Sequence, residues 1–245
     1  MTDIAARLTR VRGQIAEAAL RSGRRPDDVS LIAVSKTFPL EAVREAYAAG
    51  QRLFGENKVQ ELLLKAEAGR DMAGLEWHLI GHLQSNKARK AAAAAHAIHV
   101  VDSTDLLQRI DRAAAEAGRH VQVLLQVDLA LESTKFGAPV DEVPLLIAAA
   151  RQCTAAQLSG LMLIPPAVDD PEDARPWFRR LRELRDRLVD GGVPVDLLRH
   201  LSMGMSHDFP VAIEEGATLV RVGSAIFGVR QYAVAAGAGD IPTAG

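Results

Sequence analysis

The sequence predicts an α/β protein built as a (β/α)8 barrel with one leading helix at its amino terminus. Eight apolar, strand-like segments alternate with helical segments along 245 residues, close to the roughly 250 typical of such barrels. Near-continuous apolar strands between helices indicate a parallel sheet covered on its faces. The alternative is an open doubly wound sheet, which a G-x-G-x-x-G turn after the first strand would favour. The turn here reads SKTFPLEA and has no glycine.

The chain opens with an amphipathic segment over residues 4–23, which predicts a helix with Gly23 as its stop signal. The strand segments share runs of aliphatic residues: 30–36, 52–57, 75–81, 97–103, 121–130, 158–164, 198–204 and 218–228, the last including a turn. The other helical segments share apolar residues at helical spacing: 39–50, 58–69, 85–96, 104–118, 140–152, 171–192 and 206–216. Pro39 and Gly50 suit the two ends of one helix, and Ser103 can cap another.

Nothing in the chain marks a second domain. We find no linker, internal repeat or low-complexity stretch, so we expect one barrel domain over residues 1–232 and a frayed, Gly-rich tail over 233–245. Hydrophobic residues make up 48% and charged residues 24% of the chain, which is typical of a globular protein.

Charge and cysteine content exclude several classes of partner. The net charge of −2 gives no electrostatic case for nucleic acid or an anionic membrane surface. Cys153 is the single cysteine, which excludes an internal disulfide and a cysteine-based zinc site. No secretory signal and no apolar run of about 20 residues is present, so we expect a cytoplasmic protein without a membrane span.

Polar residues follow the predicted strands, where the active sites of barrels lie. Lys36 follows the first strand and Asn57 the second, and Arg221 ends the eighth. The turns SMGMS and VGSAIFG follow the seventh and eighth strands. We expect these groups to converge on one face of the barrel.

The two Gly/Ser turns predict a phosphate site. Glycine allows close backbone approach, serine supplies hydroxyl groups, and barrels often bind phosphate with the loops after strands seven and eight. The alternative is that Gly204 and Gly223 merely form tight turns.

Lys36 is either a lysine whose amine reaches water or a reactive amine. At the end of a buried strand the amine can be desolvated, which lowers its pKa and favours Schiff-base chemistry. A Schiff-base lysine opposite a phosphate site indicates pyridoxal 5′-phosphate. Arg221 would then face the pyridine nitrogen, unless it pairs with a carboxylate such as Glu56.

Seven motifs between residues 31 and 230 resemble the pyridoxal-phosphate homeostasis protein family, also called the YggS/PROSC family. The motifs are AVSKTFP, FGENKVQE, WHLIGHLQSNK, STKFG, GLMLI, LSMGMSHDF and VRVGSAIFG. The resemblance implies the alanine racemase N-terminal barrel fold and pyridoxal phosphate held on a lysine. It also implies a role in cofactor homeostasis and delivery without established catalytic turnover.

The resemblance also implies roles for individual residues. Two positions depart from the family pattern: His207 stands where relatives often have Asp or a small residue, and Asp128 where they more often have Asn. The implied cofactor-binding residues are Lys36 as the Schiff-base lysine, Ser206, Gly223 and Ser224 at the phosphate with Ser202 in the same cradle, Arg221 at the pyridine nitrogen, and Asn57 beside the cofactor.

The alternative function is a single-domain amino-acid racemase that uses the same cofactor. Alanine racemases resemble this chain over the barrel but carry a second β-domain that supplies a catalytic tyrosine. The tyrosines here, Tyr47 and Tyr232, fall in an early helix and near the tail, away from the strand ends. Besides Lys36, the weaker acid/base candidates are His78, His82 and His207.

We expect no metal site and few partners. His78 and His82 have the i, i+4 spacing of helical metal ligands, but we place them on a strand and in the loop after it. The expected partners are pyridoxal phosphate and the apo-enzymes that receive it, and we expect the protein to be a monomer.

Overall fold

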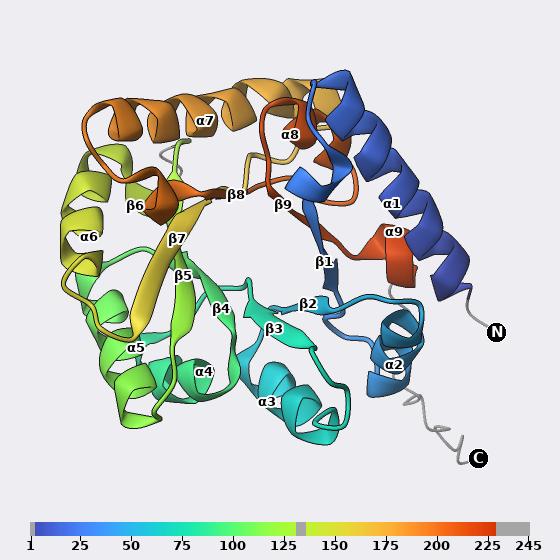
Figure 1. Cartoon of the computed structure of the whole chain (residues 1–245), viewed down its shortest axis with the longest axis horizontal. Helices are drawn as coiled ribbons and strands as arrows, with labels where there is room; N and C mark the ends of the chain where they lie inside the picture. Colours follow the sequence, from blue (N-terminus) through green and yellow to red (C-terminus); the bar gives the residue numbers. More distant parts are fainter. Residues whose placement is uncertain (1–2, 131–135, 229–245) are drawn as a thin grey trace, which may run out of the picture.

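The computed structural model describes residues 3–130 and 136–228, which form a closed barrel of parallel strands surrounded by helices (Figure 1). In ring order the strands run β4-β3-β2-β1-β9-β8-β7-β5, and pairing of β4 with β5 closes the ring. The predicted (β/α)8 fold is confirmed, and the open doubly wound sheet is wrong because no edge remains in the ring. The barrel strands are β1 (Ser30–Val34), β2 (Leu53–Glu56), β3 (Glu76–Leu79), β4 (Ala97–Val101), β5 (Val121–Asp128), β7 (Ala156–Met162), β8 (His200–Ser202) and β9 (Leu219–Val222).

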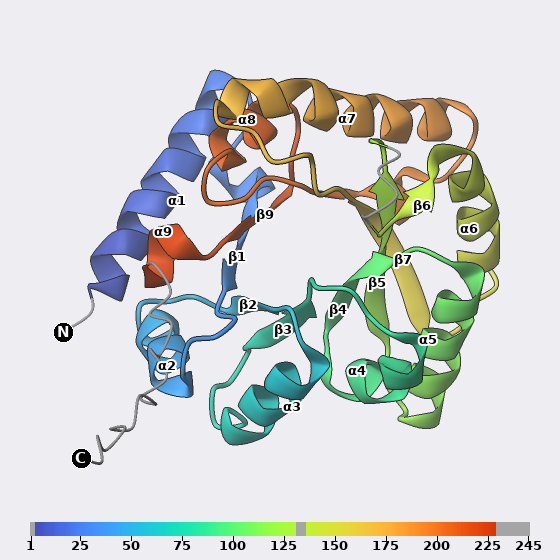
Figure 2. The same ribbon diagram turned by 180° about the vertical axis from the view of Figure 1, so that it is seen from behind.

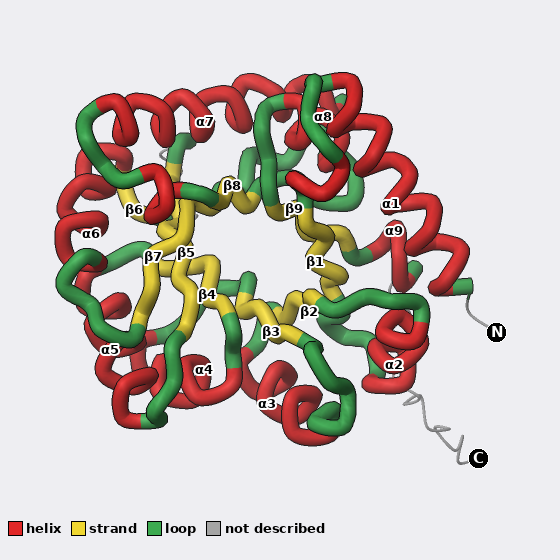
Figure 3. Tube along the Cα trace, viewed as in Figure 1, coloured by secondary structure: helices red, strands yellow, loops and turns green. Residues whose placement is uncertain are grey.

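One strand was not predicted. β6 (Ala138–Pro139) pairs with the end of β5 outside the ring (Figure 3). It is two residues long, too short to leave an alternation of polar and apolar residues in the sequence. The predicted tail at 233–245, the end of the predicted domain at 232 and Lys135 all lie outside the described residues.

Among the described residues, eight helices follow the predicted helical segments but are shorter, and three of these begin with a 3-10 turn. Those turns cover residues 85–87, 140–142 and 171–174. The ninth, α9 (Ser224–Phe227), falls in the segment predicted as the last strand and turn. The helices are α1 (Ile4–Arg21), α2 (Leu40–Ala48), α3 (Val59–Ala68), α4 (Ala88–Ala94), α5 (Thr104–Glu116), α6 (Val143–Ala150), α7 (Arg175–Asp190), α8 (Phe209–Glu214) and α9 (Ser224–Phe227).

The leading helix α1 completes the outer layer. It packs against α8, α9 and α2, on the side of the barrel where β9 and β1 pair (Figures 1 and 2). Leu8, Val11 and Ile15 lie on its buried face at helical spacing. Because α9 has only four residues, α1 covers the strands that a longer eighth helix would otherwise protect.

Side chains pack on both faces of the strands. Phe54 and Trp77 contact each other at 5.8 Å between ring centroids on neighbouring strands β2 and β3. On the other face of β2, a side chain on Gly55 would meet Ile32 and Ile80 at about 3 Å. The barrel interior at Gly55 therefore has no room for a side chain, and a cavity opens at the carboxyl ends of the strands. None of the helices in residues 3–130 and 136–228 is long and apolar enough to cross a membrane.

Candidate functional site

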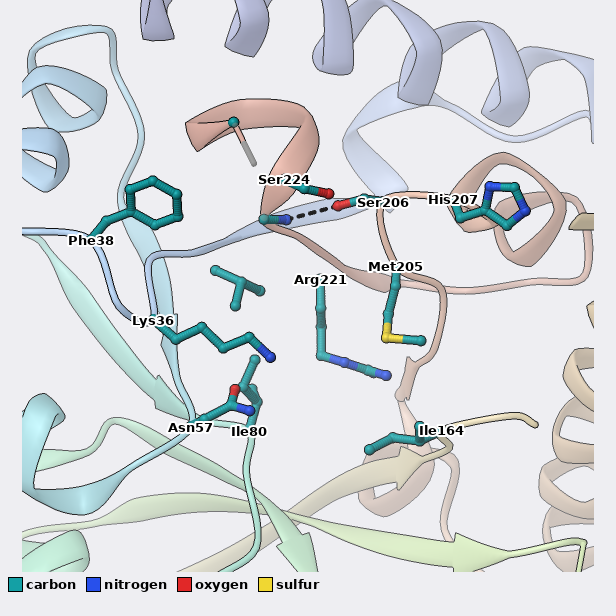
Figure 4. A pocket seen from close by; sticks show the side chains of 13 residues that line it. Lys36, Phe38, Asn57, Ile80, Ile164, Met205, Ser206, His207, Arg221 and Ser224 are labelled. Carbon is teal, nitrogen blue, oxygen red and sulfur yellow. Dashed lines mark hydrogen bonds between the residues drawn. The ribbon is translucent and has the colours of Figure 1, made fainter. Parts of the chain in front are cut away.

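A cavity of about 570 Å³ opens at the carboxyl ends of the strands (Figure 4). Six of the seven predicted cofactor-binding residues line it: Lys36, Asn57, Ser206, Arg221, Gly223 and Ser224. Ser202, the seventh, does not. The remaining lining residues are Val34, Phe38, Ile80, Ile164, Met205, His207 and Gly228.

Lys36 sits in a tight turn directly after β1. Thr37, the next residue, has a φ of +69°, a conformation that a β-branched residue rarely adopts. Its backbone amide donates to Glu61 Oε1 at 2.6 Å. On the other side of Lys36, the hydroxyl of buried Ser35 donates to Glu56 Oε1 at 2.6 Å. Side chains from β2 and α3 thus fix the backbone on both sides of Lys36.

Lys65 joins these two anchors. Its buried ammonium group donates to Glu56 Oε1 at 2.7 Å, to Glu61 Oε1 at 2.9 Å and to the Ser35 carbonyl at 2.7 Å. Burial raises the pKa of Glu56, and the charge of Lys65 opposes that shift. Because Glu56 is engaged here, the alternative in which it pairs with Arg221 is wrong.

The turn between β8 and α8 presents Ser206 to the cavity. Gly223 N donates to Ser206 Oγ at 3.0 Å, which ties this turn to the one after β9 (Figure 4). Asp208 Oδ1 accepts from Met205 N at 2.6 Å and closes the turn. Gly204 has a φ of +90° and faces Ala212, not the cavity, so the tight-turn explanation applies to it. Ser224 lies beside Ser206 at the start of α9.

Arg221 is buried with only one face toward the cavity. Its guanidinium group donates to Ser202 Oγ at 2.7 Å and to the Leu163 carbonyl at 2.9 Å. No carboxylate among the described residues forms an ion pair with it, and burial lowers its pKa to about 10. A buried cation without a paired anion favours a ligand that is negatively charged or accepts hydrogen bonds. Ser202 therefore contacts Arg221 and does not line the cavity.

Asn57 and Ile80 form the wall opposite the serines, and the Lys36 side chain extends between the two walls toward Arg221 (Figure 4). Gly81 makes this wall possible, because a Cβ there would lie 2.4 Å from the Asn57 carbonyl oxygen.

The histidines lie in different surroundings. Within residues 3–130 and 136–228, no group of three His, Cys, Asp or Glu side chains is placed to hold a metal ion. His78 is buried in the barrel, whereas His82 is exposed and stacks on Phe136 at 3.5 Å between ring centroids. His207 lines the cavity, and its Nε2 lies 2.8 Å from the Asp169 carbonyl.

Sequence reasoning missed the supporting residues. Glu61 and Lys65 have the i, i+4 spacing of an ion pair, which was the available signal for the anchor behind Lys36. The apolar lining by Phe38, Ile164 and Met205 carried no signal, because isolated apolar residues in loops are common.

Comparisons with known proteins agree with this geometry. The family described as "Alanine racemase, N-terminal domain" matches residues 8–231. The pyridoxal phosphate homeostasis protein of Aquifex aeolicus (strain VF5) is 44% identical over 227 residues, which covers 92% of this chain and 98% of that protein. The chain belongs to the pyridoxal phosphate homeostasis protein family. Family members at this level of identity match the present chain over nearly their whole length.

Solved structures show the same relation. PipY of Synechococcus elongatus PCC7942, solved with PLP bound, is 44% identical to this family member, with a TM-score of 0.77 over 92% of this chain and 100% of PipY. The alanine racemase of Streptomyces coelicolor A3(2) has a TM-score of 0.65 at 21% identity, over 92% of this chain and 59% of the racemase. At that identity the likeness shows the fold alone.

The donor set of the cavity fits pyridoxal phosphate, the cofactor in the family's name. That molecule has an aldehyde, a dianionic phosphate and a ring nitrogen that accepts a hydrogen bond. The cavity offers groups for each: the Lys36 amine, the hydroxyls of Ser206 and Ser224, and the Arg221 guanidinium, which has no carboxylate partner among the described residues.

Proposed function

We propose that this protein binds pyridoxal 5′-phosphate as a Schiff base on Lys36 and takes part in intracellular homeostasis and delivery of the cofactor. One observation carries the proposal: a single cavity brings together the Lys36 amine, the serines of the turns after β8 and β9, and a buried guanidinium without a carboxylate partner among the described residues. Membership of a family named for this cofactor supports it.

Each lining residue has a proposed task. When bound, the cofactor supplies an aldehyde that condenses with a primary amine and releases water. The turn around Thr37 points the Lys36 amine into the cavity. Ser206, Gly223 and Ser224 hold the phosphate, Arg221 donates to the ring nitrogen, and Asn57 packs beside the ring.

We propose that the protein holds the cofactor and does not use it for catalysis. Racemisation needs acid/base groups on both faces of the ring. Apart from Arg221, the described residues that line the cavity include two with a basic nitrogen, Lys36 and His207. The His207 Nε2 lies within hydrogen-bond distance of the Asp169 carbonyl. Tyr47 lies on α2 and its Oη donates to the Ala73 carbonyl, and Tyr232 lies outside the described residues. Turnover of D- or L-amino acids by the purified protein would instead support the racemase.

The proposed setting follows from the same function. Apo-enzymes that need pyridoxal phosphate are the proposed recipients, and we propose a cytoplasmic monomer. Transfer of the cofactor to such an apo-enzyme, followed by the activity that the recipient regains, tests the delivery role. Sedimentation of the pure protein tests the monomer.

Lys36→Ala is expected to abolish the covalent adduct. Borohydride reduction of the wild-type protein with pyridoxal phosphate should give one stable adduct, which peptide mass spectrometry places on Lys36. The variant should lose both this adduct and the visible absorbance of the bound cofactor. Exposed Lys90, replaced by alanine, is the control and should behave as the wild type. A reducible adduct at the same site in Lys36→Ala would show that the assignment of Lys36 is wrong.

Ser206→Ala is expected to weaken binding while the adduct still forms. The change removes a hydroxyl at the phosphate and leaves the Gly223 amide without its acceptor. Losing hydrogen bonds to a charged group costs about 1.5–3 kcal/mol, or about 10- to 150-fold in affinity. Fluorescence titration with pyridoxal phosphate measures the change. An equal loss of affinity for pyridoxal, which has no phosphate, would contradict a role at the phosphate.

A further inference from the structure

Four buried polar side chains form a continuous hydrogen-bonded chain across the barrel interior. Arg221 Nη1 donates to Ser202 Oγ at 2.7 Å, and Ser202 Oγ lies 2.9 Å from His99 Nδ1. His99 Nε2 lies 2.8 Å from His78 Nδ1. None of the four is more than 4% exposed, and only Arg221 lines the cavity. The chain links β9, β8, β4 and β3.

Arg221 fixes one end of this hydrogen-bonded chain. A guanidinium group can only donate, so Ser202 Oγ accepts from Arg221, and its own proton is available for His99 Nδ1. In the arrangement where Ser202 donates to His99, His99 is neutral, and its proton on Nε2 points to His78 Nδ1. The proton of His78 then lies on Nε2, a buried atom without a hydrogen-bond partner in the described part of the chain. Glu76 Oε2 is the neighbouring carboxylate oxygen, at 3.9 Å.

The surroundings of His99 keep it in the protonation state that the chain requires. The groups that face it are His78 on β3, Ser202 and His200 on β8, and Arg221 on β9. Burial lowers the pKa of His99 well below its ordinary value, and the charge of Arg221 acts in the same direction. Only a neutral imidazole has a nitrogen that can accept the Ser202 proton.

We propose that this hydrogen-bonded chain of four side chains positions the Arg221 guanidinium on the cavity wall. His99 does not line the cavity, but through Ser202 it governs how firmly Arg221 donates to the ring nitrogen of bound pyridoxal phosphate. The inference rests on the proposed function for the identity of the ligand. Ser202 Oγ and the Leu163 carbonyl are the two acceptors that hold the guanidinium. Without His99 the Ser202 hydroxyl can rotate freely, so the lone pair that Ser202 offers to Arg221 no longer has a fixed direction.

Two substitutions at His99 separate positioning from packing. His99→Leu removes the acceptor for Ser202 and is expected to weaken pyridoxal phosphate binding about tenfold, the equivalent of one hydrogen bond. It should also move the midpoint of the pH titration that is followed by the visible absorbance of the bound cofactor. His99→Gln can accept from Ser202 and donate to His78, and should recover most of the affinity and the wild-type midpoint.

The control is Ile110→Val, a fully buried change in α5 outside the cavity. It should lower stability without moving the titration midpoint. Unchanged affinity and midpoint in His99→Leu, or an equal shift in Ile110→Val, would overturn the proposal.

A measurement on the protein without cofactor tests the hydrogen-bonded chain of side chains itself. Nitrogen NMR of the imidazole rings should show His99 neutral and protonated at Nε2, the nitrogen that faces His78. The opposite tautomer, or a doubly protonated His99 at neutral pH, would overturn the proposal even if His99→Leu does not fold. Absence of a reducible adduct on wild-type Lys36 would instead contradict the proposed function, so the two failures are distinguishable.

Discussion

Replacing Lys65 with methionine is expected to lower the free energy of unfolding by about 3–5 kcal/mol, the usual effect of removing one partner from a buried ion pair. Lys65 is 7% exposed and Glu56 is fully buried, so the lost ammonium is not replaced by water. Glu56 would keep only the Ser35 hydroxyl, and its Oε2 already has no hydrogen-bond partner in the described part of the chain. Urea unfolding measures the change.

The loss of stability in Lys65→Met should depend on pH in a defined direction. Burial raises the pKa of Glu56 above its ordinary value of 4.5, and removing Lys65 removes the charge that opposes this shift. A carboxyl group whose pKa is higher in the folded state costs stability as the pH rises through that window. The destabilisation of Lys65→Met should therefore be larger at neutral pH than near pH 4.5.

Two further variants make this test specific. Lys90→Met removes an exposed lysine and should change stability by less than about 0.5 kcal/mol. The double variant Glu56→Gln/Lys65→Met removes the stranded carboxylate and should recover much of the loss. A loss below about 1 kcal/mol in Lys65→Met would show that the buried pair contributes little.

Gly160→Ala is expected to destabilise the barrel by about 3 kcal/mol or more, at the upper end of the range for overpacking. A Cβ on Gly160 would lie 2.0 Å from the carbonyl oxygen of His200, its partner in the register of β7 with β8. A backbone atom cannot turn aside as a flexible side chain can, so the two strands would have to separate. Because β8 leads into the turn that carries Ser206, binding of pyridoxal phosphate should also weaken.

Gly13→Ala provides the matched control. Gly13 lies in the exposed part of α1, and nothing stands within 4 Å of a Cβ built there. Alanine has the higher helix propensity, so this variant should gain about 0.5–1 kcal/mol. Thermal unfolding of both variants compares them directly, and a small effect of Gly160→Ala would mean that β7 and β8 can part without cost.

The sequence predicted the elements because their causes are local. Alternation of apolar and amphipathic segments depends on neighbours in the chain, and it placed seven barrel strands within a few residues. The segment 218–228, predicted as the last strand and a turn, contains the strand β9 and the short helix α9. The first strand ends at Val34, two residues before the predicted end, and the next residue, buried Ser35, donates its hydroxyl proton to Glu56. The two-residue β6 depends on the strand it pairs with, which local pattern does not reveal.

The candidate site divides in the same way. Lys36, the Gly/Ser turns and Arg221 could be found from the sequence, because each follows a strand and barrels gather these positions at one face. Their partners could not. Ser202 was expected beside the phosphate, but it lies against Arg221 and His99, since its neighbour across the barrel is set by closure of the ring.

The amino-acid sequence by itself determined the barrel, the lysine after its first strand and the two turns suited to phosphate, since periodicity and residue type carry that information. Only the tertiary structure decided which charges meet. In the fold Glu56 forms an ion pair with Lys65, and Arg221 has no carboxylate partner among the described residues. Lys65 reaches Glu56 from α3, the helix that follows β2, whereas Arg221 donates to Ser202 on β8 and to the Leu163 carbonyl after β7. Burial makes these contacts decisive because a buried charge needs its partner within the fold.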